Sequence, residues 1–474
     1  RGFMRQDVAE RVGLHLEEPA RSMVRAVFRL YFAGRPVREA REFIQRWLIE
    51  AGLGAAMYDI MNKPVYCRCG TEIVVKVLED QWFINYGDAQ WKQLARQLVG
   101  EMSIVPEEAK AHFLATIDWL DKRACARTRG LGTPLPWGSG WVIESLSDST
   151  IYMAYYTVIK KVRQFNIRPE QLTEEFWDYV FLGQGDVAEV SQKAGVPPNA
   201  LEEIRGEFGY WYPLDSRNSG KDLVPNHLTF FIFNHVAIFP REKWPRGIVA
   251  NGWVLREGEK MSKSRRNVLP LLKAVETYGA DPLRATLAMS AEVEQDLDFR
   301  DLEARRNTQQ LVAIYAIAQR LAQPVDREDW LDYWLVSEMA QLLERAREAY
   351  EKARVRQAAV ETLYNAKSLF DQYLAMVERP SRLALEAARA WAVALEPIVP
   401  HLAEELWALL GGVGLAAKTP WPKLKTDPTA LLAKRYIDMV VEDIKNIPAF
   451  RQGVKKVAIY VNPNFHWLKA GQDV

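Results

Sequence analysis

The chain has 474 residues and a net charge of +1, with 49% hydrophobic and 26% charged residues. This length is too great for one hydrophobic core, and the near-zero charge excludes a globally basic surface for nucleic acid. Three cysteines exclude a disulfide scaffold and favour a reducing, cytoplasmic setting, while no apolar run is long enough to span a membrane. No signal peptide opens the chain, and its start at Arg1-Gly2 without a methionine leads us to expect a fragment or a processed piece.

The first third of the chain is expected to combine amphipathic helices with short strands. Apolar residues at helical spacing predict a helix from Val37 to Gly52. Ile73 to Leu78 is typical of a strand, and residues 88–123 are expected to be helical. Cys67 and Cys69 form a C-x-C pair before a turn glycine, but a zinc site would need two more ligands. We therefore favour a plain turn with two thiols, unless a partner chain supplies the missing ligands.

A strand that leads into a helix is predicted between Trp141 and Tyr152. The polar run Ser147-Asp-Ser-Thr150 between them is typical of a helix N-cap. In α/β sheets, strand ends that face helix N-termini are also where ligands bind, so the run has a functional interpretation beside the structural one. Residues 169–212 follow as a helical insert rich in aromatic residues, and Phe230 to Phe239 as a buried apolar helix or strand.

The stretch from Ser219 to Phe230 has the residue types of a nucleoside site. Gly220 lets a ligand approach the backbone, and Asp222 can accept protons from two hydroxyl groups, as a ribose would offer. His227 lies about one helical turn further on. The alternative interpretation of the same residues is an ordinary helix cap and a buried core histidine.

The stretch from Gly252 to Ser264 is the most informative part of the chain. It predicts a short strand from Gly252 to Leu255, a tight turn at Glu257-Gly258, and an exposed loop with Lys260 and Lys263. Two mobile ammonium groups with hydroxyls and backbone N–H groups between them suit a polyphosphate. The alternative is a solvated basic loop, because arginines follow directly.

From about residue 303 to 446 the composition shifts to Ala, Leu, Glu and Arg. Apolar residues recur at helical spacing in successive segments, separated by Pro380, Pro397 and Gly411-Gly412. This pattern predicts an α-helical bundle. Residues 454–461 are expected to be a strand that opens a further domain.

These motifs carry a resemblance to a known family. Lys260-Met-Ser-Lys-Ser264 matches the second signature of class I aminoacyl-tRNA synthetases letter for letter. The surrounding stretches, from Pro225 to Phe230 and from Tyr278 to Arg284, resemble leucyl-tRNA synthetase of the archaeal and eukaryotic type. Pro397 to Trp407 is similar to the helical tRNA-binding domain shared by the leucine, isoleucine and valine enzymes.

The resemblance implies an α/β plus all-α architecture: the second half of a class I, Rossmann-like nucleotide-binding fold, followed by an α-helical tRNA-binding bundle. The domains that it implies are the tail of the editing domain over residues 1–63, the half catalytic domain over 64–255 with an insert near 169–218, the Lys/Ser loop and stem-contact region over 256–302, the bundle over 303–450, and the start of a truncated domain over 451–474.

The implied reaction activates leucine with ATP and then transfers it to tRNA-Leu. Lys260 and Lys263 would be catalytic, neutralising the departing pyrophosphate together with Mg²⁺. The resemblance further implies an ATP site and a leucine pocket. ATP would contact Gly220, Asp222, Asn251, Gly252, Ser262 and Lys263, and leucine would contact Leu146, Ser149 and His227.

One family feature is missing from the chain. The first signature, His-x-Gly-His, cannot be formed by the six histidines, at positions 15, 112, 227, 235, 401 and 466. We therefore expect one subunit of a split enzyme or an incomplete sequence, inactive alone. A complementary chain would supply the first half of the catalytic domain and the editing site.

Two alternatives stay open at this point. The first is an isoleucyl, valyl or methionyl enzyme, against which the Ser147 to Tyr152 and Gly220 to Phe230 stretches favour leucine. The second is a non-catalytic tRNA-binding paralogue. An intact Lys260 to Ser264 speaks against it, because a chain relieved of catalysis has no physical reason to keep a phosphate loop.

We expect Lys263→Ala, in a complete enzyme, to lower the rate of leucine activation far more than the affinity for ATP. A lysine that engages charge developing on pyrophosphate stabilises the transition state more than the ground state. Steady-state ATP–pyrophosphate exchange measures both quantities, and equal losses in kcat and in ATP affinity would contradict the role.

Overall fold

The computed structural model describes residues 22, 33–34, 36–55, 59–60, 62–67, 70–76, 81–138, 140–262, 266–447 and 456–459. The chain divides into two compact units, residues 1–81 and 82–474. Each is described by itself below. Among the described residues, no helix combines the length and the apolar content that crossing a membrane requires.

In the first unit, α3 (Val37–Glu50) confirms the predicted helix, and Gly52 follows it with a φ of 69°. None of its side chains is buried. The strand predicted from residue 73 is wrong over the described residues 73–76. A short hairpin bridges Tyr66 and Glu72, and its last backbone bond runs from the Ile73 N–H to the Val65 carbonyl at 2.8 Å. Residues 74–76 lie exposed beyond the hairpin and in no strand, because no neighbouring strand in the described part pairs with them.

The centre of the second unit is a parallel sheet. Its strand order is β2 (Ser103–Val105), β7 (Gly247–Asn251) and β6 (Arg217–Gly220). The expectation of an all-helical stretch over residues 88–123 is corrected here. Helices α4 (Ala89–Glu101) and α5 (Ala109–Trp119) flank β2, whose three residues are too few to show a period of their own.

Aromatic packing joins this sheet to its helices. Helix α11 (Thr229–Ile238) is mostly apolar, and its side chains from Thr229 to Phe233 are buried, as expected for a core helix. Tyr86 stacks on Phe230 with ring centroids 4.8 Å apart, and the Trp91 indole N–H donates to the Phe233 carbonyl at 2.7 Å. Two antiparallel strand pairs complete this part: β1 (Phe83–Asn85) pairs with β3 (Lys122–Ala124), and β4 (Ala126–Arg127) with β5 (Val142–Ile143).

The helical structure predicted for residues 169–212 is confirmed, while its status as an insert stays a prediction. It follows α6 (Ser145–Asp148) and α7 (Tyr152–Gln164), and its aromatic side chains pack mainly against one another and the core. The elements within it are η1 (Pro169–Gln171), α8 (Glu174–Trp177), η2 (Asp178–Leu182), α9 (Val187–Ala194) and α10 (Pro198–Trp211). The chain returns through η3 (Lys221–Leu223) and η4 (Val224–Leu228) to α11, and η5 (Arg241–Lys243) precedes β7.

A second, smaller sheet carries the Lys/Ser loop. Its order is β10 (Leu297–Phe299), β8 (Val254–Arg256) and β9 (Glu259–Lys260), with β8 parallel to β10 and antiparallel to β9. Helices α12 (Leu271–Tyr278) and α13 (Ala280–Ser290) pack beside it.

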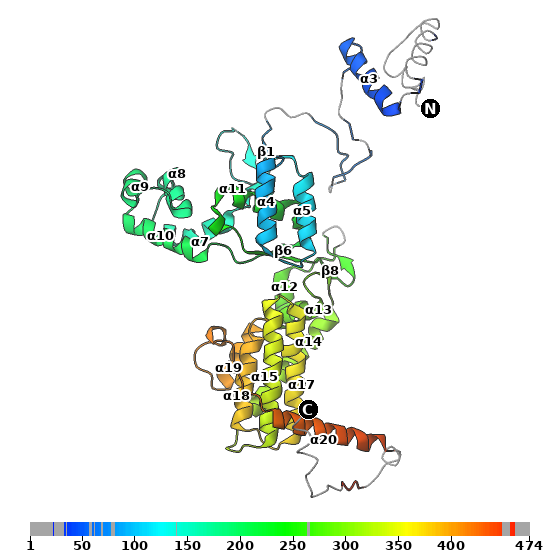
Figure 1. Cartoon of the computed structure of the whole chain (residues 1–474), viewed down its shortest axis with the longest axis vertical. Helices are drawn as coiled ribbons and strands as arrows, with labels where there is room; N and C mark the ends of the chain where they lie inside the picture. The colour runs from blue at the N-terminus through cyan, green and yellow to red at the C-terminus, as the bar shows by residue number, and fades with distance from the viewer. Residues whose placement is uncertain are drawn as a thin grey trace. The chain divides into compact units, whose positions relative to one another are not determined.

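The predicted bundle is confirmed as well (Figure 1). Helix α15 packs along α18, with the fully buried Trp391 in the core between them. The described residues 456–459, where a strand was expected, are not in one. The elements of the bundle are α14 (Asp301–Leu321), α15 (Trp330–Glu351), α16 (Val355–Ala359), η6 (Val360–Asn365), α17 (Ala366–Met376), α18 (Arg382–Leu395), α19 (Pro400–Leu409), η7 (Ala416–Lys418) and α20 (Pro428–Asn446).

Two side chains from α13 join the small sheet region to the bundle. The buried Asp281 carboxylate accepts the backbone N–H of Leu402 at 2.6 Å, at the start of α19, where such donors otherwise lack a partner. Arg284 donates to the carbonyls of Ile398 at 2.9 Å and Pro397 at 2.7 Å. The two stretches that carried the family resemblance, 278–284 and 397–407, therefore contact each other.

The buried His235 makes the stability of α11 dependent on pH. Its Nδ1 lies 2.8 Å from the Phe231 carbonyl, and its Nε2 lies 3.3 Å from the Tyr212 hydroxyl. Burial lowers the pKa of His235 to about 4. The unfolded chain therefore takes up this proton first as the pH falls below about 6.5, which favours unfolding.

We expect the opening free energy of α11 to fall between pH 6.5 and 4, by up to about 1.4 kcal/mol per pH unit from this group. Hydrogen exchange of the α11 amides, corrected for intrinsic rates, measures it. His235→Phe should remove this component, and His112→Asn, at an exposed position of α5, should leave it intact. Identical pH profiles for the wild type and His235→Phe would contradict the assignment.

Candidate functional site

Two of the predicted nucleotide residues meet at the carboxyl end of the parallel sheet. Strands β6 and β7 run parallel, and their register pairs Gly220 with Asn251 at the carboxyl ends of both strands. This edge is where ligands bind in open α/β sheets. The structure thus brings together residues that lie about thirty positions apart in the sequence.

Gly220 and Asp222 form the turn that leaves β6. A Cβ on Gly220 would lie 2.5 Å from Oδ1 of Asp222, so a side chain there would displace the carboxylate. Asp222 is exposed, in η3, and its backbone carbonyl accepts from the Asn226 side chain at 3.0 Å. The carboxylate is therefore positioned at the strand end and accessible to a ligand's hydroxyl groups.

Gly252 is buried where β7 leads toward β8, one residue beyond the predicted nucleotide ligand Asn251. Its N–H donates to the Val293 carbonyl at 2.9 Å. A Cβ would lie 2.1 Å from the Gln295 carbonyl oxygen, closer than any packed contact allows. The glycine is thus required for two backbone segments to pass each other, and the expected strand from Gly252 instead begins at Val254.

Asp296 links two parts of the site, a role that the sequence did not predict. Its Oδ1 accepts from Nζ of Lys221 at 2.5 Å and from the backbone N–H of Trp253 at 2.9 Å. The hydrogen bond from Lys221, more than that from Trp253, lowers the pKa of Asp296. One carboxylate therefore connects the turn of Asp222 with the strand that leads to Lys260.

The hairpin that carries Lys260 has the predicted tight turn. Glu257 and Gly258 both have positive φ, 50° and 80°, as a two-residue hairpin turn requires. The Gly258 N–H donates to Oδ1 of Asp298 at 2.7 Å. Lys260 is exposed in β9, and its Nζ lies 3.6 Å from the centroid of the Trp253 indole.

Asn267 fastens the two sides of the loop, which the sequence reasoning did not foresee. Its Oδ1 accepts the Ser262 backbone N–H at 2.9 Å, and its Nδ2 donates to the Lys260 carbonyl at 3.2 Å. Lys263, the second predicted catalytic lysine, lies outside the described residues. The signal for Asn267 in the sequence was a side-chain amide that follows soon after a polar loop.

Two of the three predicted leucine-pocket residues contact each other. Nδ1 of the buried His227 lies 3.4 Å from the Leu146 carbonyl, and Nε2 lies 3.4 Å from a guanidinium nitrogen of Arg217. Burial, chiefly, lowers the pKa of His227. Because an arginine is always a donor, Nε2 accepts and Nδ1 carries the proton. Arg217, also over the Tyr152 ring at 5.4 Å, is a member of this cluster that the sequence reasoning missed.

Only the first half of the polar run after β5 is helical, in the short helix α6, and this corrects the predicted N-cap. Oε2 of Glu144 caps α6 by accepting the Leu146 N–H at 2.9 Å. The predicted pocket residue Ser149 ends α6, and its hydroxyl donates to the Ser145 carbonyl at 2.8 Å. Glu144 caps α6 because its carboxylate reaches a backbone N–H in the first turn of that helix. Helix α7 begins after Ile151, which provides no side-chain cap.

The weak metal hypothesis gains no support in the described part of the chain. Cys67 is disulfide-bonded, so the expected turn with two thiols is wrong at this residue, and the thiolate that zinc requires is absent there. Cys69 lies outside the described residues. No group of three or more His, Cys, Asp or Glu side chains in the described ranges is arranged to bind a metal ion.

Comparison with known proteins identifies the family. Curated leucine--tRNA ligases of Pyrobaculum neutrophilum and Pyrobaculum calidifontis are 79% and 77% identical over 99% and 100% of this chain. The leucine--tRNA ligase 2 of Saccharolobus solfataricus is 44% identical over 93% of the chain. The chain belongs to the leucine--tRNA ligase family. It spans about half the length of these relatives, 50% of the two Pyrobaculum proteins and 48% of the Saccharolobus protein.

Two family models and a solved structure support the fold of this leucine--tRNA ligase relative. Models described as "tRNA synthetases class I (M)" and "Anticodon-binding domain of tRNA ligase" match residues 210–322 and 332–458. Mycobacterium tuberculosis methionyl-tRNA synthetase in complex with methionyl-adenylate has a TM-score of 0.53 at 19% identity, over 73% of this chain and 65% of that one. The predicted class I fold followed by a helical domain is thereby confirmed.

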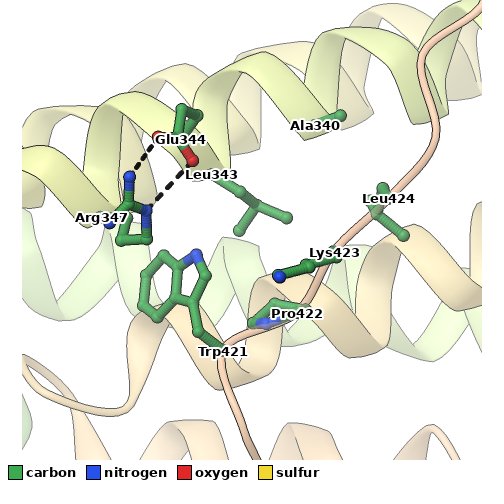
Figure 2. A pocket seen from close by; sticks show the side chains of 8 residues that line it. All are labelled: Ala340, Leu343, Glu344, Arg347, Trp421, Pro422, Lys423 and Leu424. Atoms are coloured by element: carbon green, nitrogen blue, oxygen red, sulfur yellow. Dashed lines mark hydrogen bonds and ion pairs between the residues drawn. The ribbon is translucent and has the colours of Figure 1, made fainter.

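A cavity of about 260 Å³ lies within the region that the anticodon-binding model matches. Figure 2 shows the Trp421 indole on one side of it and the ion-paired Arg347 and Glu344 of α15 on the other. Lys423 is exposed at the same cavity. An aromatic face and cationic groups are thus available at one surface of the bundle.

We expect Gly252→Ala to destabilise the site by roughly 1–3 kcal/mol or more, because its Cβ would overlap a backbone carbonyl that cannot move alone. Gly206→Ala is the matched control. It lies in α10 with open space around its Cβ and should stabilise by roughly 0.5–1 kcal/mol. Thermal unfolding of both variants measures the difference, and effects of the same sign would contradict the close approach.

Proposed function

We propose that this chain supplies the nucleotide-activating edge and the helical tRNA-binding part of a leucine--tRNA ligase. The supporting observation is that Gly220, Asp222 and Asn251 meet at one sheet edge, which the Asp296 carboxylate ties to the strand leading to Lys260. The relatives named leucine--tRNA ligase favour leucine over isoleucine, valine or methionine as the amino acid.

In the proposed reaction, a leucine carboxylate oxygen attacks the α-phosphate of ATP and pyrophosphate leaves. Asp222 would accept hydrogen bonds from the ribose hydroxyls, beside the backbone of Gly220, Asn251 and Gly252. Lys260, Ser262 and Lys263 would stabilise the charge that develops on pyrophosphate. Mg²⁺ would supply further charge neutralisation when bound.

Leu146, Ser149 and His227 would line the leucine pocket. A neutral His227 with its Nδ1 proton directed to the Leu146 carbonyl adds no charge of its own to this wall, which suits an apolar side chain. Arg217 would keep the buried imidazole of His227 oriented by donating to its Nε2. These roles are proposals that follow from position and chemistry.

The tRNA would contact the helical bundle. The cavity between α15 and Trp421 offers an indole on which an unpaired base could stack, and Lys423 a cation for phosphate. A chain carrying the His-x-Gly-His signature and the editing site would complete the enzyme. The proposal includes the domain boundaries that the resemblance implies, after residues 63, 255, 302 and 450. The structure itself divides the chain between residues 81 and 82.

ATP–pyrophosphate exchange with leucine, isoleucine, valine and methionine tests the proposal on the enzyme assembled from this chain and the polypeptide with the first signature. We expect exchange with leucine only. Asp222→Ala should raise the KM for ATP roughly ten- to a hundredfold, as expected for the loss of a charged hydrogen-bond acceptor.

The matched control is Asp215→Ala. Asp215 lies before the opposite end of β6 and pairs with Arg246 on the exposed surface at 2.9 Å, where an ion pair contributes little. It should leave the KM unchanged. An assembled enzyme that binds tRNA-Leu but exchanges with none of the four amino acids would instead support a non-catalytic tRNA-binding paralogue.

A further inference from the structure

The ammonium of Lys260 has a defined partner in the structure. Its Nζ lies 3.6 Å from the centroid of the Trp253 indole. Lys260 pairs with Leu255 across the β8–β9 hairpin, and Trp253 immediately precedes β8. A lysine over the face of an indole is attracted by the electron-rich ring, and tryptophan gives the strongest such contact.

Trp253 is itself fixed at its backbone. Its N–H donates to Oδ1 of Asp296 at 2.9 Å, and its carbonyl accepts the Leu297 N–H at 2.8 Å. The same Asp296 oxygen accepts Nζ of Lys221 at 2.5 Å, next to Asp222. The indole therefore has a constrained position relative to the turn that carries Asp222.

We propose that Trp253 is a positioning residue for Lys260, and that its indole holds the ammonium beside the nucleotide edge until a polyphosphate takes it over. This inference rests on the proposed function, because it takes Lys260 as a phosphate ligand. It adds a residue outside the Lys/Ser signature to the machinery of that loop.

The chemistry of the contact allows the Lys260 ammonium to move reversibly from the indole to a phosphate; this transfer is called the handover below. A lysine stem has several rotatable bonds, and holding its end in place before ATP arrives lowers the entropy lost in the transition state. A neutral ring holds the ammonium weakly and does not repel phosphate. A carboxylate in the same place would compete with the phosphate for the ammonium and repel the nucleotide.

The contact can be tested on this chain by nuclear magnetic resonance. Lysines are converted to ¹³C-dimethyl-lysine, which keeps its charge, and the Lys260 signal is assigned by its loss in Lys260→Arg. We expect an upfield ring-current shift that Trp253→Leu abolishes and Trp253→Phe partly keeps. An unshifted Lys260 signal in the wild type, with the other lysine signals intact, would overturn the proposal.

The positioning role is tested in the assembled enzyme by pyrophosphate exchange. Trp253→Leu should lower kcat about two- to fivefold, the factor that corresponds to an exposed cation–π contact, with the KM for ATP unchanged. Trp253→Phe should retain most of the rate. A raised kcat would mean that the ring only sequesters Lys260, and an equal loss in kcat and affinity would mean a structural role; either result overturns the proposal.

The two proposals fail in different ways. With the wild-type assembled enzyme, magnesium pyrophosphate should move the Lys260 signal downfield, toward the position of solvated lysines. A ring-current shift that does not respond, in an enzyme without exchange activity, refutes the proposed function and with it the handover. A shift that does not respond in an enzyme active in exchange refutes the handover alone.

Discussion

The parallel pairing of β6 with β7 is the constraint on which the rest of the site depends. Its register places Gly220 opposite Asn251, so two turns that lie about thirty residues apart in the sequence leave the sheet at the same end. The first turn carries Asp222. The second turn carries Gly252 and leads to β8 and the lysine hairpin. A slip of one residue would reverse the side-chain faces of β6 and dismantle the edge.

Beyond the strand ends, the site is held together by the close approach of two backbone segments. Gly252 passes the segment at residues 293–296 at a distance that excludes any side chain, and Asp296 in that segment then binds both Lys221 and Trp253. The small sheet is thus held against the large one by a glycine contact and one shared carboxylate. Lys221 engages the Asp296 carboxylate, whereas Lys260 contacts the neutral Trp253 indole and forms no ion pair within the described part of the chain. Of these two lysines, Lys260 is therefore the one that can serve an incoming phosphate.

The joint between the α/β part and the bundle uses the same kinds of interaction. Asp281 satisfies donors at the start of α19, and Arg284 satisfies carbonyls just before it. Groups at a helix start are costly to bury without partners, so this pairing specifies how α13 meets α19. The resemblance of the two stretches to one family has a physical basis in this contact.

Much of the architecture follows from the sequence alone. Helical periodicity located the bundle, the insert and α3, and the turn chemistry of Glu257-Gly258 located the lysine hairpin, because these depend on neighbours a few residues apart. The sequence did not show β2, the Glu144 cap, or the roles of Asp296, Asn267 and Arg217. Each of these depends on a partner that only tertiary packing brings near, or on an element too short to have a period. A strand as short as β2 forms only because the neighbouring strand β7 pairs with it. The role of Asp296 likewise depends on the two donors that the fold brings to its carboxylate.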